Sequence, residues 1–196
     1  SLEAIQEYLS PHLSMIALCW CFGFAVCFLR LLGHIGQVHY LKTQRNFPAD
    51  EYWIEMKDQL LQKAGMKKAV ALVESTLVRT PLIIGHLKPY IMFPIGFINR
   101  LDPLEAEAII AHEIAHILRR DYLFNILQSL VESIFYYHPA VWWLSSTMRR
   151  EREIAADELA ISLTGNAVTY AKALVVVQEL AYFPLSPALA FAGKGK

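Results

Sequence analysis

The sequence has few cysteines and no excess of charge of either sign. The three cysteines, Cys19, Cys21 and Cys27, all lie in one apolar segment. An odd number of cysteines argues against a secreted disulfide framework, and this group lacks the second pair that a zinc ribbon needs. Eighteen Lys and Arg residues balance 18 Asp and Glu residues, and no long run of like charge occurs. The charge pattern therefore does not predict nucleic acid as a partner.

One segment lacks polar residues almost entirely. Between Leu13 and Leu32 the single charged residue is Arg30, close to one end. About 20 apolar residues suffice to cross a bilayer, so residues 13–32 are predicted to form a transmembrane helix, with a buried core helix as the alternative. A signal peptide is not favoured, because Glu3 and Glu7 precede the segment and no small-residue cleavage site follows it.

The positions of basic residues predict the orientation of this span. Residues 1–12 contain no Lys or Arg, whereas Arg30, Lys42 and Arg45 lie at or beyond the other end. By the positive-inside rule, residues 1–12 are expected to be extracytoplasmic and the chain from residue 33 onward cytoplasmic.

The region after the span changes from connector to helix to strands. A polar connector with Gly and Pro is expected from residue 33, followed by a helix that Asp50 caps and that ends at Ala64 before Gly65. Residues 69–98 are rich in β-branched and aromatic residues and in proline, which predicts two or three short strands with turns near 79–81 and 85–89. The prolines favour edge positions for these strands.

The second half of the chain is predicted to be helical. Asp102, Pro103 and Glu105 have the spacing of a capping box with Pro at the first helical position. Further breaks are predicted at His138-Pro139 and at Gly165. The expected helices are 102–120, 122–137, 139–163 and 166–183. The fold class is therefore mainly α with a small β-sheet (α+β).

The first of these helices contains H-E-x-x-H. His112 and His116 are four residues apart, so their imidazoles share one helical face and can converge on one metal ion. Glu113 is rotated about 100° from His112, which places its carboxylate at the edge of that face, as a general base and not as a ligand. The alternative is a pair of core histidines satisfied by hydrogen bonds.

The third metal ligand is predicted in the segment RREREIAADELA, residues 149–160. Glu153 and Asp157 share a helical face, and the alanines around them permit a close approach to the first helix. Glu153 is assigned as the ligand and Asp157 as the acceptor for a ligand histidine's other ring nitrogen. Glu151 is the rival ligand, but it has no carboxylate four residues on. The alternative is a solvated charged face.

Several segments together resemble a known family. AHEIAHILRRDYLFN, YYHPAVWWLS, RREREIAADELA and VRTPLIIGHLKPYIMFP are similar in content, order and spacing to the membrane antirepressor metallopeptidases of the BlaR/MecR type. The resemblance covers roughly residues 15–183. It implies a zincin-like domain over 33–183, one Zn²⁺ per chain held by His112, His116 and Glu153, and a location in the inner membrane of a bacterium. It also implies a sensor domain missing from this chain, with 184–196 as a truncated tail.

The resemblance and the residues agree on hydrolysis of a peptide bond in a protein substrate, with a transcriptional repressor as one candidate. His138, in a helix break before proline, is a candidate hydrogen-bond donor to the reacting carbonyl oxygen; the alternative is that it caps the helix from Pro139. Weaker candidates are Tyr136, Tyr137 and Tyr170.

Two questions about the site stay open at this point. The segment IGHLKPYIMFP is expected either to bind an extended peptide by β-addition or to form an ordinary hairpin over the core. The alternatives to a peptidase are a signal transducer whose core responds to the absent sensor domain, and a non-catalytic membrane scaffold.

Overall fold

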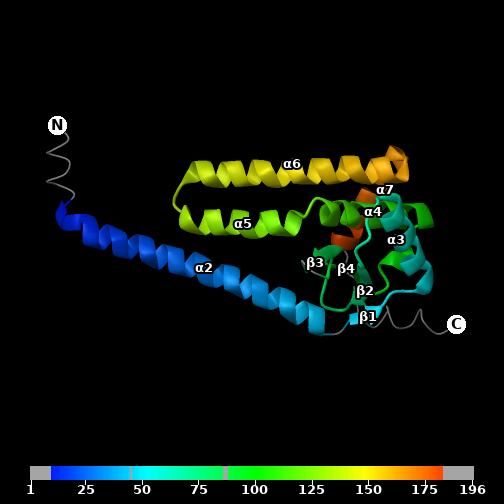
Figure 1. Cartoon of the computed structure of the whole chain (residues 1–196), viewed down its shortest axis with the longest axis horizontal. Helices are drawn as coiled ribbons and strands as arrows, with labels where there is room; N and C mark the ends of the chain where they lie inside the picture. Colours follow the sequence, from blue (N-terminus) through cyan, green and yellow to red (C-terminus); the bar gives the residue numbers. More distant parts are fainter. Residues whose placement is uncertain (1–9, 45, 86–87, 183–196) are drawn as a thin grey trace.

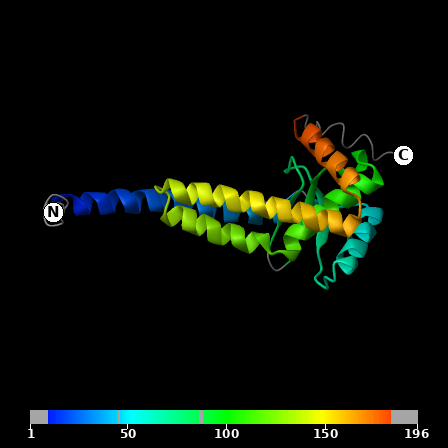
Figure 2. The ribbon, with the colours of Figure 1, turned by 90° about the horizontal axis from the view of Figure 1, so that it is seen from above.

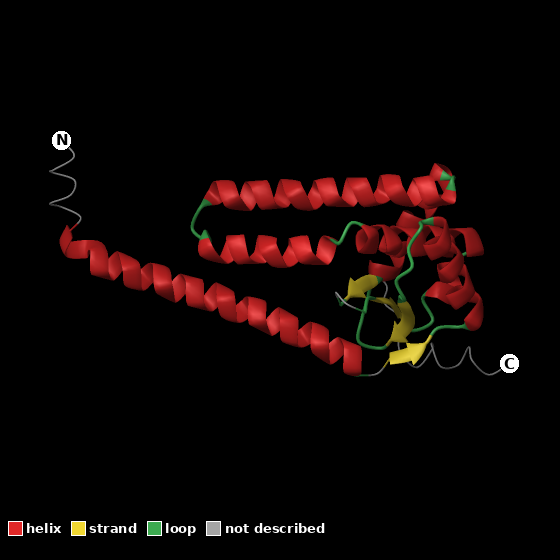
Figure 3. Cartoon of the chain, viewed as in Figure 1, coloured by secondary structure: helices red, strands yellow, loops and turns green. Residues whose placement is uncertain are grey.

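The computed structural model describes residues 10–44, 46–85 and 88–182. One long helix and a pair of helices extend to one side of a smaller body, in which the strands and the remaining helices gather (Figures 1 and 2). Helices α5 (Asp121–Ile134) and α6 (Pro139–Thr164) form an antiparallel hairpin, and α2 (Leu13–Thr43) runs beside it. The expected mainly α fold with a small sheet is confirmed (Figure 3).

Helix α2 follows a 3₁₀ turn, η1 (Ser10–His12), and is longer than the predicted span. The sequence predicted a connector from residue 33, but the helix continues through Gly33 and Gly36 to Thr43, so the predicted domain boundary falls inside it. Two glycines cost a helix about 1 kcal/mol each. Packing offsets this cost, because Val38 and Leu41 contact a small apolar cluster at the sheet. Most of the predicted segments 1–12 and 184–196 lie outside the described residues.

The sheet has four strands in the order β1-β2-β4-β3, and β2 and β4 run parallel while both outer strands are antiparallel to their neighbours. Their bounds are β1 (Asn46–Pro48), β2 (Ala71–Ser75), β3 (Leu82–Ile84) and β4 (Tyr90–Pro94). The sequence predicted the last three and missed β1, whose three residues carry no alternating pattern. The edge prediction is right for β3 and wrong for β2 and β4, which are interior strands.

The register explains why β4 tolerates proline. Strand β3 pairs with residues 90–92 of β4, so Pro94 lies beyond the last of these pairs and its missing N–H falls where β3 has ended. Pro89 lies just before the strand, where proline is also tolerated.

The core lies between the sheet and helix α4 (Pro103–Leu118), with α3 (Glu51–Lys63) and α7 (Ala167–Tyr182) beside it. Ile91 and Phe93 of the sheet, with Ile110 and Ile114 of α4, are fully or almost fully buried. The predicted capping box at Asp102 and Glu105 is present, and the short 3₁₀ turn η2 (Ile98–Arg100) precedes it. The central helix of the fold is therefore the one that carries H-E-x-x-H.

Two helix ends position the site. Helix α4 ends at Leu118, and Arg120 turns the chain directly into α5 with a left-handed φ of 58°. Helix α5 ends at Ile134, three residues earlier than predicted, because a turn over 135–138 precedes Pro139. Helix α6 then returns to α4, where Ala156 and Ala160 are completely buried and permit the close approach that the sequence predicted.

Candidate metal centre

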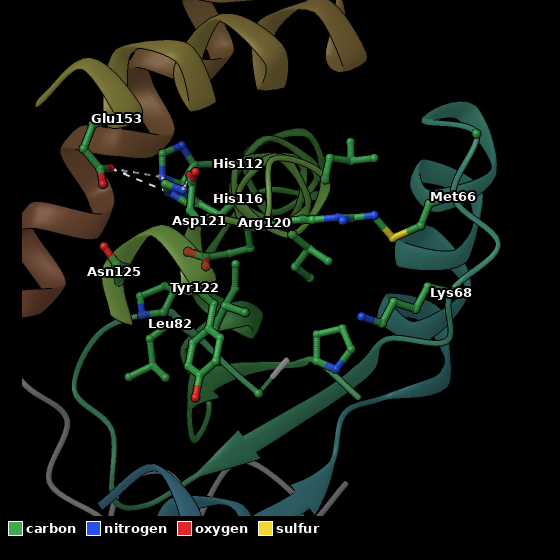
Figure 4. A pocket seen from close by; sticks show the side chains of 18 of the residues that line it. Met66, Lys68, Leu82, His112, His116, Arg120, Asp121, Tyr122, Asn125 and Glu153 are labelled. Atoms are coloured by element: carbon green, nitrogen blue, oxygen red, sulfur yellow. Dashed lines mark hydrogen bonds and ion pairs between the residues drawn. The ribbon is translucent and has the colours of Figure 1, made fainter. Parts of the chain in front are cut away.

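The two histidines of H-E-x-x-H converge as their helical spacing requires. His112 and His116 lie one turn apart on α4, their rings are nearly perpendicular with centroids 4.7 Å apart, and their Nε2 atoms are 3.2 Å apart. Figure 4 shows both rings at one end of a pocket, facing Glu153.

Helix α6 supplies the third donor. Glu153 Oε2 lies 3.8 Å from His112 Nε2 and 3.7 Å from His116 Nε2. Donor atoms of the three residues all lie within 4.8 Å of one another. Glu153, and not the rival Glu151, is the α6 carboxylate in this cluster. In a tetrahedral zinc site with bonds of about 2.0–2.1 Å, the ligand atoms stand about 3.3 Å apart, so this donor set fits a zinc ion.

The remaining ring nitrogen of each histidine has a carboxylate partner. His116 Nδ1 is 2.7 Å from Asp121 Oδ2, and His112 Nδ1 is 3.1 Å from Asp157 Oδ1. An Nδ1–H that donates to a carboxylate leaves the lone pair on Nε2. Two Nε2 lone pairs then face each other at 3.2 Å beside a carboxylate, an arrangement that a bound cation satisfies.

Asp157 and Tyr170 act together behind His112. The Tyr170 hydroxyl is 2.8 Å from His112 Nδ1 and donates to Asp157 Oδ1 at 2.5 Å. Burial, and then the neighbouring Asp157, raise the pKa of Tyr170, so its hydroxyl stays protonated. The sequence considered Tyr170 as a donor to the substrate, but the structure places its hydroxyl against His112.

Burial sets the protonation of the two central α4 residues. Burial is the main cause that lowers the pKa of His112, with His116 adding to it, which keeps the ring neutral as a metal ligand must be. Burial also raises the pKa of the Glu113 carboxyl to about 7. Glu113 is buried and lines the same cleft as the histidines.

The cleft has a volume of about 840 Å³ and runs from the donor cluster to the sheet. Leu82 and Ile83 of the edge strand β3 line it, and α4 and the start of α5 form the opposite side. Tyr122 and Asn125 of α5 also line it, which the sequence did not predict. In Figure 4 the Arg120 side chain extends from the histidines toward Met66 and Lys68.

The structure does not bring His138 to this cleft. His138 is exposed and precedes α6, 15 residues before Glu153, which corresponds to about 22 Å of helix at 1.5 Å per residue. Tyr136 and Tyr137 lie in the same turn. The aromatic segment around His138 is therefore at the tip of the α5–α6 hairpin, and the prediction that His138 donates to the reacting carbonyl oxygen is wrong.

A family model agrees with this geometry. The model described as BlaR1 peptidase M56 matches residues 3–190, almost the whole chain. The chain belongs to the BlaR1 peptidase M56 family. The resemblance drawn from the sequence motifs is thereby confirmed.

Individual members of this family are similar at low identity. The chain is 26% identical to the regulatory protein BlaR1 of Bacillus licheniformis over 70% of this chain and 23% of that protein. It is 24% identical to the methicillin resistance mecR1 protein of Staphylococcus aureus (strain Mu50 / ATCC 700699) over 76% of this chain and 25% of that protein. The chain thus spans about a quarter of the length of these two relatives.

A protease of another name is also similar. The protease HtpX homolog 2 of Methanosarcina acetivorans is 26% identical over 43% of this chain and 40% of that protein. Membership of a metallopeptidase family implies a metal ion, and the donor cluster on α4 and α6 is the candidate site for this ion.

Sequence reasoning missed Asp121 as a partner of a ligand histidine. Asp121 is five residues after His116, a spacing at which a continuous helix would carry its side chain off the His116 face. The left-handed Arg120 between them ends α4 and returns the Asp121 carboxylate to His116. The one available signal was an acidic residue immediately after the basic pair at 119–120.

Proposed function

We propose that this chain is the catalytic part of a membrane-anchored, zinc-dependent endopeptidase that hydrolyses a peptide bond of a protein substrate. One observation carries the proposal: His112, His116 and Glu153 direct three donor atoms to one point at the wall of an open cleft. Catalytic zinc sites have three protein ligands and keep one position open, whereas structural sites are closed by a fourth. Within the described ranges this cluster has three such residues.

In the proposed reaction the metal and Glu113 have different roles. Bound zinc supplies Lewis-acid polarisation of the scissile carbonyl and acidifies a water. Glu113 accepts a proton from the attacking water as the water oxygen bonds to the carbonyl carbon. Glu113 then delivers that proton to the amine nitrogen as the C–N bond breaks. His112 and His116 stay neutral and in fixed orientation through Asp157 and Asp121.

The edge of the sheet supports an extended substrate. Strand β3 pairs on one side with β4, its other side is the edge of the sheet, and it lines the cleft. An extended peptide that adds to this edge would run along the cleft past the donor cluster, with main-chain hydrogen bonds giving affinity. We therefore favour β-addition over the alternative that this hairpin only covers the core.

The membrane anchor in this proposal is α2. It contains the one candidate span among the described residues, a stretch with mean hydropathy 2.2 and no buried residues. The distribution of basic residues supports a cytoplasmic location for the peptidase domain in this proposal.

The test compares wild type with Glu113→Gln in cells and with purified protein. We expect zinc content to be equal and cleavage to fall about 10²- to 10⁴-fold in the variant, since a general base is lost. Proteomics of both cell types should find a protein that persists intact with Glu113→Gln. Glu107→Gln, on the same helix, is the matched control and should cleave like wild type. Equal cleavage by Glu113→Gln and wild type would refute the role given to Glu113.

A second candidate function is regulatory proteolysis. It is favoured by two similar proteins, one named a regulatory protein and the other a methicillin resistance protein, both about three times as long as this chain. In this case the peptidase responds to a ligand-binding domain elsewhere in a longer protein and cleaves a transcriptional repressor. The full-length gene tests it: a ligand-binding domain encoded beyond residue 196 supports the regulatory role, and a gene without one counts against it.

A further inference from the structure

The α5–α6 hairpin has its apolar side chains on the outside. Phe124 and Leu127 of α5 are 51% and 58% exposed, and Trp143 and Leu144 of α6 are 69% and 53% exposed. Between Tyr122 and Met148 the sequence has one Asp, Glu, Lys or Arg residue, Glu132. A hairpin with this surface would be unfavourable in water.

Polar groups of the hairpin face inward instead. Gln128 is buried and donates to the Ser145 carbonyl at 3.0 Å and to Glu132 at 3.0 Å. The Glu132 carboxylate is paired with Arg149 at 2.6 Å, and Arg152 donates to Gln128 at 2.7 Å. This is the reverse of the arrangement in a water-soluble helical hairpin, where the apolar residues face inward.

Several polar groups at and near the tip of the hairpin are satisfied within the protein. The indole N–H of Trp142 donates to the Tyr136 carbonyl at 2.7 Å, and the backbone N–H of His138 donates to the Phe135 carbonyl at 2.9 Å. The Ser146 hydroxyl donates back to the Trp143 carbonyl at 2.7 Å. Irregular backbone is tolerated at membrane depth only where such groups are satisfied by protein.

The tip also contacts the middle of the candidate span. The Tyr136 hydroxyl donates to the Cys19 carbonyl at 3.3 Å, and a Cβ at Gly23 would clash with the Tyr136 ring. Because Gly23 has no Cβ, the Tyr136 ring packs directly against α2 at this position. Cys19 and Gly23 lie inside the apolar stretch 13–32, so any membrane that surrounds α2 at this level also surrounds the hairpin tip.

Two helix lengths, one on α6 and one on α2, give the same depth for the hairpin tip in the bilayer. On α6, Arg149 is ten residues from Pro139, which corresponds to about 15 Å of helix. On α2, the end of the apolar stretch at Leu32 is nine residues from Gly23, or about 14 Å. Each is about half of a hydrocarbon layer of about 30 Å, so both lengths place the tip near the middle of the bilayer.

We propose that α5 and the first half of α6 form a re-entrant hairpin, inserted into the bilayer beside α2 with acyl chains covering its apolar faces. Asp121 at the base of α5 and Glu153, just beyond the basic residues of α6, then hold the metal centre at the membrane surface. The substrate is accordingly a segment of protein close to the membrane. This inference rests on the membrane anchor in the proposed function, but not on the peptidase chemistry.

The four tryptophans allow a direct test in the full chain reconstituted into phosphatidylcholine vesicles with bromine atoms deep in the acyl chains. One variant, Trp20→Phe with Trp53→Phe, keeps only the hairpin pair Trp142 and Trp143. Two further variants keep only Trp20, in the span, or only Trp53, which is buried beside the sheet. Equal far-UV circular dichroism spectra of all three verify that each one folds.

We expect the brominated lipid to remove at least as large a fraction of the hairpin fluorescence as of the Trp20 fluorescence, and to leave Trp53 nearly unquenched. Quenching of Trp20 without quenching of the hairpin pair would overturn the re-entrant hairpin and leave the anchor intact; a second copy or another protein segment covering the hairpin would give this result. Absence of quenching for both would overturn the hairpin and the anchor together. Cleavage by Glu113→Gln is measured in a separate experiment. A failure of the peptidase proposal is therefore distinguished from a failure of the hairpin proposal.

Discussion

At the scale of single residues, the site depends on carboxylates that are not metal ligands. Asp121 is 5% exposed and accepts from His116 Nδ1, and Arg119 Nε lies 3.7 Å from the same oxygen. Such partners fix the tautomer and ring orientation of a ligand histidine. Because Arg120 makes the turn that brings Asp121 back, one residue in an uncommon backbone conformation positions half of the imidazole pair.

Removal of this partner should weaken metal binding without removing a ligand. For Asp121→Ala we expect a loss of about 10- to 100-fold in zinc affinity, because His116 loses the acceptor that orients it. Competition with a chromogenic chelator measures this. Asp58→Ala on α3, which removes an exposed carboxylate paired with Lys57, is the control and should bind zinc like wild type. An unchanged affinity in Asp121→Ala would show that His116 needs no such partner.

At the scale of elements, the chain contains two kinds of helical surface. Helix α4 buries its apolar face in the core, with Ile110 and Ile114 at 0% exposure. The hairpin of α5 and α6 encloses its polar groups and leaves its apolar side chains outside. The same hydrophobic effect explains both surfaces once the second one is in contact with lipid.

This contrast predicts different costs for the same substitution. Leu144 on α6 is 53% exposed and Leu104 on α4 is 62% exposed. In vesicles, Leu144→Lys should destabilise the fold by about 2 to 3 kcal/mol, since it places an ammonium in hydrocarbon. Leu104→Lys, at a surface in water, should change stability by less than about 0.5 kcal/mol. Unfolding followed by tryptophan fluorescence measures both, and equal effects of the two substitutions would contradict the lipid-facing assignment.

At the scale of the whole molecule, the metal centre lies where the helical hairpin meets the smaller body. Helix α4 gives two of the three clustered donor residues and α6 the third, α5 provides Asp121, and α7 provides Tyr170. An ion bound at this cluster would link helices that are distant in sequence, so it would contribute to folding as well as to chemistry.

Zinc removal should consequently lower thermal stability. At a free zinc concentration 1,000 times the Kd, binding stabilises the folded state by about 4 kcal/mol, which for a chain of this size corresponds to roughly 8 to 16 °C in Tm. Chelation should lower Tm by this amount, and added zinc should restore it. Glu113→Gln should keep the zinc-dependent shift and His112→Ala should lose it. A Tm that is insensitive to chelation in wild type would contradict a zinc site at this cluster.

The sequence alone determined the local features of this protein. The capping box at Asp102 and Glu105, the histidine pair at i and i+4 and the helix stop at Gly165 all follow from backbone and side-chain preferences within a few residues. The apolar stretch 13–32 could also be identified from the sequence, because hydropathy is a property of composition. These features place H-E-x-x-H on a helix and the candidate ligands on its accessible face.

Only the tertiary structure decided which distant groups meet. It placed Asp121 and Tyr170 at the histidines and His138 at the hairpin tip, and it extended α2 eleven residues past its apolar stretch. None of these follows from periodicity, since each depends on how helices pack or on one left-handed turn at Arg120. Local propensity sets where a helix begins and which face is apolar; the direction in which the next helix leaves is set by contacts that form only when the chain is folded.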